Sequence, residues 1–185
     1  MCPICHTQLN QTVLVPDLPA YKCSNCEGIW ISANEYFAWQ QNETRSAWQS
    51  VDFTMSFEIP FPVSDNDRAI LCPDCGRLLR RYRIWPNIQF NLDRCSHCNG
   101  IWFDRNEWQT LQAQNLHTTI NMFFTETWQK QLRGEEIYSR FDKMYLALFG
   151  QDDYQKIKEV RLWLNHHPNG SRLLAFLTDR DPYKG

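Results

Sequence analysis

Four Cys-x-x-Cys pairs, arranged as two copies of one pattern, constrain this 185-residue chain more than any other feature. The pairs use all eight cysteines of the sequence. The first copy reads Cys2-Pro-Ile-Cys5 and Cys23-Ser-Asn-Cys26-Glu-Gly-Ile-Trp30, and the second reads Cys72-Pro-Asp-Cys75 and Cys95-Ser-His-Cys98-Asn-Gly-Ile-Trp102. The first pairs are offset by 70 residues and the second pairs by 72. The copies therefore differ by two residues between their pairs, a change that a hairpin tip tolerates.

This spacing is typical of metal sites. Two cysteines separated by two residues can direct both sulfurs toward one point, and two such pairs complete a tetrahedral four-sulfur site without an open position. A unit of about 40 residues buries too little apolar surface to fold alone, and zinc binding supplies the missing stability. His6 and His97 lie beside complete cysteine sets, so we do not expect them to be ligands. The sequence predicts two structural Zn²⁺ ions, bound by Cys2, Cys5, Cys23 and Cys26 and by Cys72, Cys75, Cys95 and Cys98.

The segments between the cysteine pairs have the pattern of β-hairpins. Residues 12–15 are expected to pair with 21–22 across a Pro-rich turn, and residues 79–84 with 88–92 across Trp-Pro-Asn. After each second pair, a capping residue precedes a glutamate by three positions, which predicts the start of a helix. Ser32 with Glu35 and Asp104 with Glu107 are these pairs, so we assign both glutamates a structural role.

The repeated motif resembles a known family. Cys-Pro-x-Cys, about twenty residues, Cys-x-x-Cys-x-Gly-Ile-Trp and a glutamate seven residues after the glycine are similar to the TFIIB-type "transcription factor zinc-finger" family of small zinc ribbons. The resemblance covers residues 2–39 and 72–109. It implies a ribbon fold and zinc at all eight cysteines, and it carries little information about function.

Iron is the rival metal, since rubredoxin-like sites also use two Cys-x-x-Cys pairs. Those sites usually have glycine directly after the second cysteine of each pair. Here only Gly76 fits, whereas His6, Glu27 and Asn99 occupy the other three positions, and this favours zinc. A thiol-based redox switch is a further alternative, because zinc-bound thiolates can be oxidised.

We expect an α+β fold with two small four-cysteine zinc ribbons, each a hairpin followed by a helix, and a C-terminal helical domain. The ribbons span 1–40 and 72–117, and the helical domain, predicted from apolar residues at helical spacing, spans 118–180. A polar tail, 181–185, follows. An acidic linker, 41–71, joins the ribbons. Apolar residues alternate with other residues in this linker, which predicts a strand that covers the rest of the protein or binds a partner. The apolar residues are Phe53, Met55, Phe57, Ile59 and Phe61.

Positive charge is concentrated in the second ribbon, while the first contains only Lys22. The arginines and aromatic residues of the predicted hairpin form a candidate surface for RNA, DNA or an acidic protein. An ordinary solvated strand with ion-paired arginines is the alternative. The candidate contact residues are Arg77, Arg80, Arg81, Tyr82, Arg83 and Trp85.

Charge and motifs narrow the function classes. Eight thiolates (−8) and two Zn²⁺ ions (+4) change the formal net charge from −2 to about −6, which argues against a protein that binds nucleic acid over its whole surface. No apolar run is long enough for a membrane span. Because the first cysteine pair begins at Cys2, we expect no signal peptide and a cytoplasmic location. No catalytic motif or small-molecule site is evident. The sequence predicts a non-catalytic zinc adaptor for a protein or nucleic-acid machine of transcription or translation, with direct RNA or DNA binding and a redox-sensing or rubredoxin-like role as alternatives.

Overall fold

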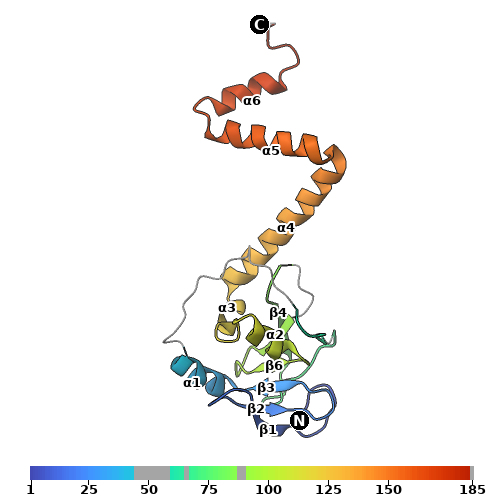
Figure 1. The fold of residues 1–185 in the computed structure, drawn as a ribbon, viewed down its shortest axis with the longest axis vertical. Coiled ribbons are helices and arrows are strands. Elements are labelled where there is room, and N and C mark those ends of the chain that lie inside the picture. The colour runs from blue at the N-terminus through green and yellow to red at the C-terminus, as the bar shows by residue number, and fades with distance from the viewer. Residues whose placement is uncertain (44–58, 65–66, 87–90, 184–185) are drawn as a thin grey trace. The chain divides into compact units, whose positions relative to one another are not determined.

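A computed structural model describes residues 1–43, 59–64, 67–86 and 91–183 (Figure 1). The strands are β1 (Asn10–Val13), β2 (Pro19–Lys22), β3 (Ile29–Ile31), β4 (Leu79–Arg83), β5 (Asn91–Cys95) and β6 (Ile101–Phe103). The helices are α1 (Ala33–Glu43), α2 (Glu107–Ala113), α3 (Ile120–Phe123), α4 (Glu126–Phe149), α5 (Gln151–His166) and α6 (Gly170–Thr178). Strands and helices in this order confirm the α+β class. No helix in the described parts of the chain is long and apolar enough to span a lipid bilayer.

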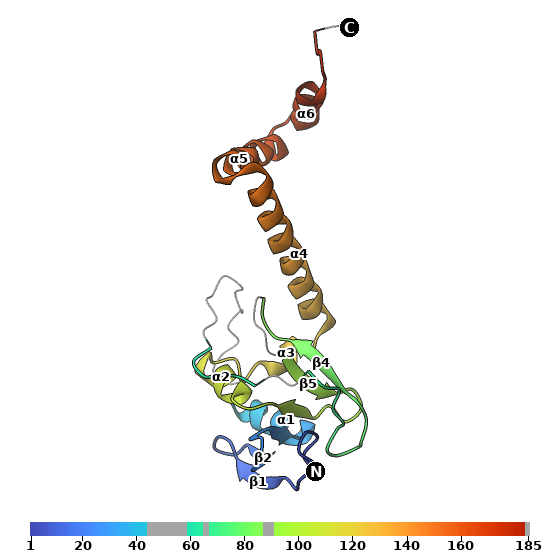
Figure 2. The same ribbon diagram turned by 90° about the vertical axis from the view of Figure 1, so that its right-hand side faces the viewer.

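Both ribbons belong to one antiparallel sheet with the strand order β1-β2-β3-β6-β5-β4 (Figures 1 and 2). Each ribbon supplies three consecutive strands, and the third strands, β3 and β6, pair with each other at the centre. Trp30 of β3 lies directly opposite Trp102 of β6. The two copies of the sequence pattern thus form a pseudo-symmetric pair of ribbons within one chain.

The hairpins confirm the predicted strand pairing, with shifted boundaries. β1 ends at Val13, two residues before the end of the predicted strand at 12–15, and its partner β2 begins at Pro19. In the second ribbon, β4 pairs with β5, and Tyr82 lies opposite Leu92, while 88–90 of the predicted second strand lie outside the described residues. The sequence analysis missed β3 and β6, because three-residue strands between a cysteine pair and a helix are too short to show an alternating pattern.

The sheet has a different core on each face. The helix-side core contains Ile29 and Ile31 of β3 together with buried residues of all four helices α1 to α4. The cysteine-side core contains Trp30, Trp102 and cysteines of both ribbons. Because successive side chains of a strand point to opposite faces, each short strand contributes side chains to both cores. The central strands β3 and β6 are therefore buried at every position.

The predicted capping box is complete at the start of α1, whereas α2 begins only at Glu107 and the box predicted before it is incomplete. The backbone N–H of Ser32 donates to the Glu35 carboxylate at 3.3 Å, and the N–H of Glu35 donates back to the Ser32 hydroxyl at 3.3 Å. In the second ribbon, the N–H of Asp104 donates to Glu107 at 2.8 Å. The Asp104 carboxylate instead accepts a hydrogen bond from Trp102 at 2.8 Å, so this box is only half formed. Both glutamates have the structural role assigned from the sequence.

The chain divides into two compact units, the ribbon unit Met1–Glu135 and the helical unit Glu136–Gly185. The sequence predicted two zinc ribbons, without deciding whether they pack together, and a helical domain at 118–180. In the structure, the ribbons share a sheet, and the segment from 118 to 135 belongs with them because Phe123, Trp128 and Leu132 are buried in the helix-side core. Most of the strand predicted in the linker, 53–58, lies outside the described residues. Ile59 and Phe61 are exposed and belong to no strand.

Candidate metal centres and the arginine-bearing hairpin

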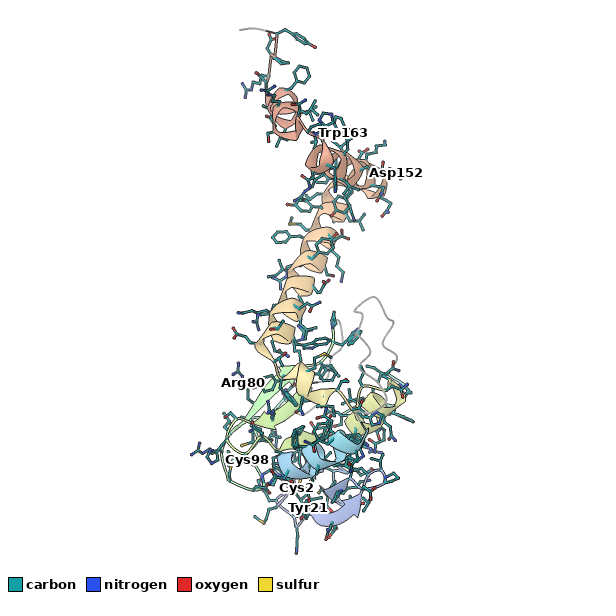
Figure 3. The ribbon with its side chains drawn as sticks, turned by 90° about the vertical axis from the view of Figure 1, so that its left-hand side faces the viewer. Cys2, Tyr21, Arg80, Cys98, Asp152 and Trp163 are labelled. Atoms are coloured by element: carbon teal, nitrogen blue, oxygen red, sulfur yellow. The ribbon has the colours of Figure 1, made fainter. Side chains whose placement is uncertain are left out.

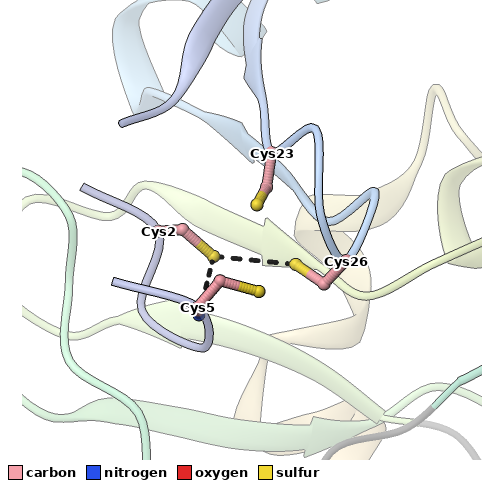
Figure 4. A group of neighbouring side chains, drawn as sticks. All are labelled: Cys2, Cys5, Cys23 and Cys26. Carbon is pink, nitrogen blue, oxygen red and sulfur yellow. Dashed lines mark hydrogen bonds between the residues drawn. The ribbon is translucent and has the colours of Figure 1, made fainter. Parts of the chain in front are cut away.

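The four cysteines of the first ribbon converge on one point (Figure 4). Their sulfur atoms all lie within 4.8 Å of one another, and the Sγ atoms of Cys2 and Cys26 are 3.6 Å apart. A tetrahedral zinc site with Zn–S bonds of about 2.3 Å requires sulfur–sulfur distances of about 3.8 Å. A disulfide would require about 2.05 Å, so the cysteines are free thiols placed for a common ion.

The second ribbon repeats this arrangement. Its four sulfurs also lie within 4.8 Å of one another, with 3.5 Å between Cys72 and Cys98 and 3.5 Å between Cys75 and Cys95. Both sites use four thiolates and leave no coordination position for a substrate, which is the chemistry of structural zinc. Within the described residues, no histidine belongs to either cluster, as expected for His6 and His97.

All four Cys-x-x-Cys turns have the same backbone conformation. The residue after each second cysteine donates its N–H to the carbonyl of the first cysteine, at 3.0 to 3.1 Å. Each of these residues has a φ between 56° and 70°, in the left-handed region. The four residues are His6, Glu27, Gly76 and Asn99. His6, Glu27 and Asn99 therefore form the same turn as Gly76. The absence of glycine at these three positions is no longer an argument against iron.

Hydrogen bonds prepare one thiol of each ribbon to ionise. Burial opposes ionisation of Cys23, but hydrogen bonds from the Thr7 hydroxyl, at 3.4 Å, and from nearby backbone N–H groups outweigh it and lower its pKa to about 6. Burial likewise opposes ionisation of Cys95, while the N–H groups of Cys98 and His97 lower its pKa to about 7. Since zinc binds thiolates, these backbone donors favour the ligand form of both side chains.

The Gly-Ile-Trp part of the motif forms the junction between the ribbons. A Cβ added to Gly28 would lie 2.2 Å from Cζ2 of Trp102, and a Cβ added to Gly100 would lie 2.2 Å from Cζ2 of Trp30. The glycine of each ribbon therefore makes room for the tryptophan of the other. Both tryptophans are almost fully buried. This reciprocal contact, which we call the Trp–Gly lock, gives the repeated motif a packing role beyond the metal sites.

The two indole N–H groups find acceptors at different positions. Trp30 donates to the carboxylate of Asp74, inside the first cysteine pair of the other ribbon, at 3.1 Å. The position equivalent to Asp74 in the first ribbon is Ile4, which has no side-chain acceptor. Trp102 donates instead to Asp104 of its own ribbon. Both of these indoles therefore have an acceptor. A strictly symmetric pair of ribbons would leave the N–H of Trp102 opposite Ile4 without one, and Asp104 supplies it instead.

The candidate contact residues of the second ribbon do not all lie on one accessible surface. Arg77 and Arg80 are exposed, and Figure 3 shows the side chain of Arg80 projecting from β4. Trp85 is buried in the helix-side core, where its ring lies 6.1 Å from that of Trp128. Arg81 makes ion pairs with Asp67 at 3.3 Å and Asp93 at 3.7 Å. Arg83 is half-buried, and its backbone carbonyl accepts a hydrogen bond from Gln129.

A short ladder of cations and aromatic rings runs across β4 and β5. The guanidinium of Arg80 lies 5.2 Å from the ring centre of Tyr82, which contacts Phe124 edge-to-face at 5.1 Å. The guanidinium of Arg94 lies 4.8 Å from the ring centre of Phe124 on the same face of the sheet. Burial lowers the pKa of Arg94. Both guanidinium groups thus make cation–π contacts within the protein. Arg94, which the sequence analysis did not select as a contact residue, belongs to the same candidate surface.

Comparisons with known proteins agree with this geometry. The family described as "Transcription factor zinc-finger", the TFIIB-type zinc ribbon, matches residues 1–42 and 71–114. No curated protein and no solved structure matches the chain. The matched segments contain all eight cysteines and all four residues of the Trp–Gly lock, and their cysteine clusters fit two zinc ions. The chain thus carries two TFIIB-type zinc ribbons, which it joins into one sheet.

Proposed function

We propose that this chain is a non-catalytic, zinc-stabilised adaptor that binds a protein through its helical unit. The observation that carries the proposal is the exposure of this unit. None of its described residues, 136–183, is buried. Fifteen large apolar side chains in its helices are between 36% and 66% exposed, and Trp163 of α5 is one of them (Figure 3).

The amount of exposed apolar surface supports this reading. A large apolar side chain offers roughly 150–200 Å² of surface, so fifteen half-exposed ones present on the order of 1,300 Å². This area is a sum over α4, α5 and α6. A specific protein complex buries about 800 Å² per partner. The helical unit therefore exposes enough apolar surface for one side of a protein interface.

The chemistry of the ribbon unit supports a structural role for the metals. Four thiolates close each site, so zinc has no position for a substrate or a reactive water. The eight free thiols fit a reducing compartment, and we place the activity in the cytoplasm. The ribbons would act as a folded module that the helical unit links to its target. The family match is consistent with a role in transcription or translation.

A tagged capture from native lysate tests the adaptor. The intact zinc-loaded chain is compared with a Leu174→Arg, Leu177→Arg double variant, which places charges on exposed apolar side chains of α6. We expect a near-stoichiometric protein that resists nuclease and is lost in the variant. A matched Phe37→Arg variant changes an equally exposed side chain of α1 in the ribbon unit and should retain the protein. Equal capture by all three chains would contradict the proposal.

Direct nucleic-acid binding is the second candidate, favoured by the exposed Arg77 and by Arg80 on its aromatic support. Its weakness is that Asp67 and Asp93 already neutralise Arg81 between them. Binding of single-stranded RNA and DNA across a salt series tests it, because contacts to phosphates weaken steeply as salt increases. An Arg80→Ala variant should then bind more weakly at low salt. No affinity at low salt would eliminate this candidate.

A further inference from the structure

The helices of the helical unit lack a core of their own. α5 and α6 contain no buried residue, and in α4 the buried residues Trp128 and Leu132 belong to the ribbon unit. Most of the stability of a protein helix comes from the packing of its apolar face, and the 16 residues of α5 include none that is buried. The unit has the helices but not the buried contacts that normally stabilise them. It therefore requires an apolar surface of similar length to cover it.

The face of α4 in this unit has the spacing of a helix-pairing seam. Tyr138, Phe141, Tyr145 and Leu148 follow one another at intervals of three, four and three residues, which is the heptad pattern of paired helices. All four are exposed, from 37% at Tyr145 to 66% at Leu148. The ring of Tyr145 stacks between Phe141, at 6.2 Å, and Phe149, at 5.8 Å. The aromatic side chains thus line one side of the helix in a row.

A groove continues this face toward α5. It has a volume of about 410 Å³, and Tyr138, Phe141 and Tyr145 of α4 line it together with Tyr154 and Leu162 of α5. The hydroxyl of Tyr154 donates to Asp142 at 2.9 Å and holds the two helices together at the groove. We call the groove and the seam beside it the aromatic face. Three of the four residues of the row also form one wall of the groove, so row and groove make one apolar face, and two such faces can pair across a two-fold axis.

Charge favours a second copy over a strongly charged partner. The helical unit contains seven acidic and eight basic residues, so its net charge is close to zero. The charges on α4 in this unit are Glu136, Arg140, Asp142 and Lys143, two of each sign. Two such faces can approach without net repulsion. Nothing in this balance selects a nucleic acid or an anionic membrane.

We propose that the aromatic face is a homodimer interface and that the chain is a two-fold symmetric dimer with two ribbon units. This inference rests on the proposed function, since it names the first partner of the helical unit. A dimer interface of standard size covers about 800 Å² on each copy. The remaining apolar surface, which includes Leu174 and Leu177 at the groove between α5 and α6, stays available for the adaptor's target. Each dimer would then carry two ribbon units, one from each chain.

Sedimentation velocity of the purified, zinc-loaded full chain tests this proposal. The chain has a mass of 22.1 kDa, and we expect a species of twice that mass at micromolar concentration that dissociates on dilution. A Phe141→Arg, Tyr145→Arg variant should weaken self-association by at least about 30-fold, the effect of losing an interface hot spot. The control is Phe37→Arg in α1, which should leave the dimer unchanged. Zinc content and circular dichroism show whether each variant is folded.

The outcomes separate this inference from the adaptor function. A wild-type chain that remains a monomer at roughly 100 µM, a concentration at which an interface of this size is normally occupied, overturns the homodimer, whatever the variants do. If that monomer still captures a stoichiometric protein through the helical unit, the adaptor proposal stands and only its first partner changes. If it captures none, both proposals fail. A dimer that survives the Phe141→Arg, Tyr145→Arg change also overturns the proposed interface. If Phe37→Arg then dissociates it, self-association lies in the ribbon unit.

Discussion

Replacing Gly28 with alanine tests the Trp–Gly lock, and with it the union of two ribbons in one sheet. The added Cβ would lie 2.2 Å from Cζ2 of Trp102 and 2.8 Å from its Cη2. Carbon atoms in contact are normally about 3.5–4.0 Å apart, so one group must move by more than about 1 Å. Trp102 has little freedom to move, since it is 0% exposed and its indole N–H bonds to Asp104.

The structure sets the size of the effect. Overpacking a core typically costs about 1–3 kcal/mol, and we expect the upper end, because the displacement would also strain a buried hydrogen bond. Gly28 does not have a left-handed φ, so alanine is acceptable to the backbone and the loss comes from the collision alone. A loss of about 3 kcal/mol lowers the folding equilibrium constant roughly 150-fold. Gly100→Ala should behave similarly, because its Cβ would meet Trp30 at the same distance.

Urea denaturation followed by circular dichroism, at a fixed free zinc concentration, measures this loss. The same substitution is then made in a Trp102→Phe background, which removes the indole ring that the new methyl group would meet. There the cost of Gly28→Ala should fall by at least about 1 kcal/mol. Gly134→Ala is the matched control. A Cβ at Gly134, in α4, meets nothing within 4 Å, and the change should stabilise the helix by up to about 1 kcal/mol.

Two results would refute the reasoning. If Gly28→Ala costs less than about 0.5 kcal/mol, below the usual cost of overpacking, Trp102 does not occupy the space that the structure gives it. If the cost is the same with Trp102 and with phenylalanine at that position, the loss arises elsewhere, and the Trp–Gly lock does not hold the ribbons together.

The ribbons offer three further predictions. Elemental analysis should find two zinc ions per chain and about one in Cys2→Ser, whose unfolding midpoint in urea should fall, because metal binding contributes much of the folding energy of each ribbon. His6→Gly should raise the free energy of unfolding in urea by up to about 1 kcal/mol, since the residue is exposed with a φ of 56°; no gain there, or no loss for Gly76→Ala, would contradict the strain argument. Asp74→Ala should cost about 1–2 kcal/mol by leaving the buried Trp30 N–H without its acceptor, and an equal cost in a Trp30→Phe background would show that this bond is not the reason.

Much of the metal chemistry follows from the sequence. The spacing of Cys2, Cys5, Cys23 and Cys26 predicted a closed cluster, and the structure brings their sulfurs together. The capping pair Ser32 and Glu35 was predictable as well. These features are local, because each depends on residues a few positions apart or on a hairpin between two short turns. The identity and spacing of the residues are then sufficient.

The arginine-bearing hairpin shows where sequence reasoning stops. The positions of Tyr82 and Trp85 in the sequence suggested nearby aromatic contacts for a partner, but Trp85 is buried against Trp128 and Tyr82 packs on Phe124. Which face of a strand is covered depends on helices that follow about forty residues later in the chain. The number of residues between Tyr82 and Phe124 contains no information about that contact.

The sequence by itself determined the two metal sites, the hairpins and the start of α1, because the free energy that drives them comes from local bonds to zinc and to backbone groups. Only the tertiary structure revealed that β3 and β6 join the ribbons, that Gly28 makes room for Trp102, and that the described part of the helical unit has no core. These features depend on contacts between distant segments, whose formation is governed by shape and burial. A linear pattern cannot express that complementarity, since the glycine and the tryptophan that fit together belong to different copies of the same motif.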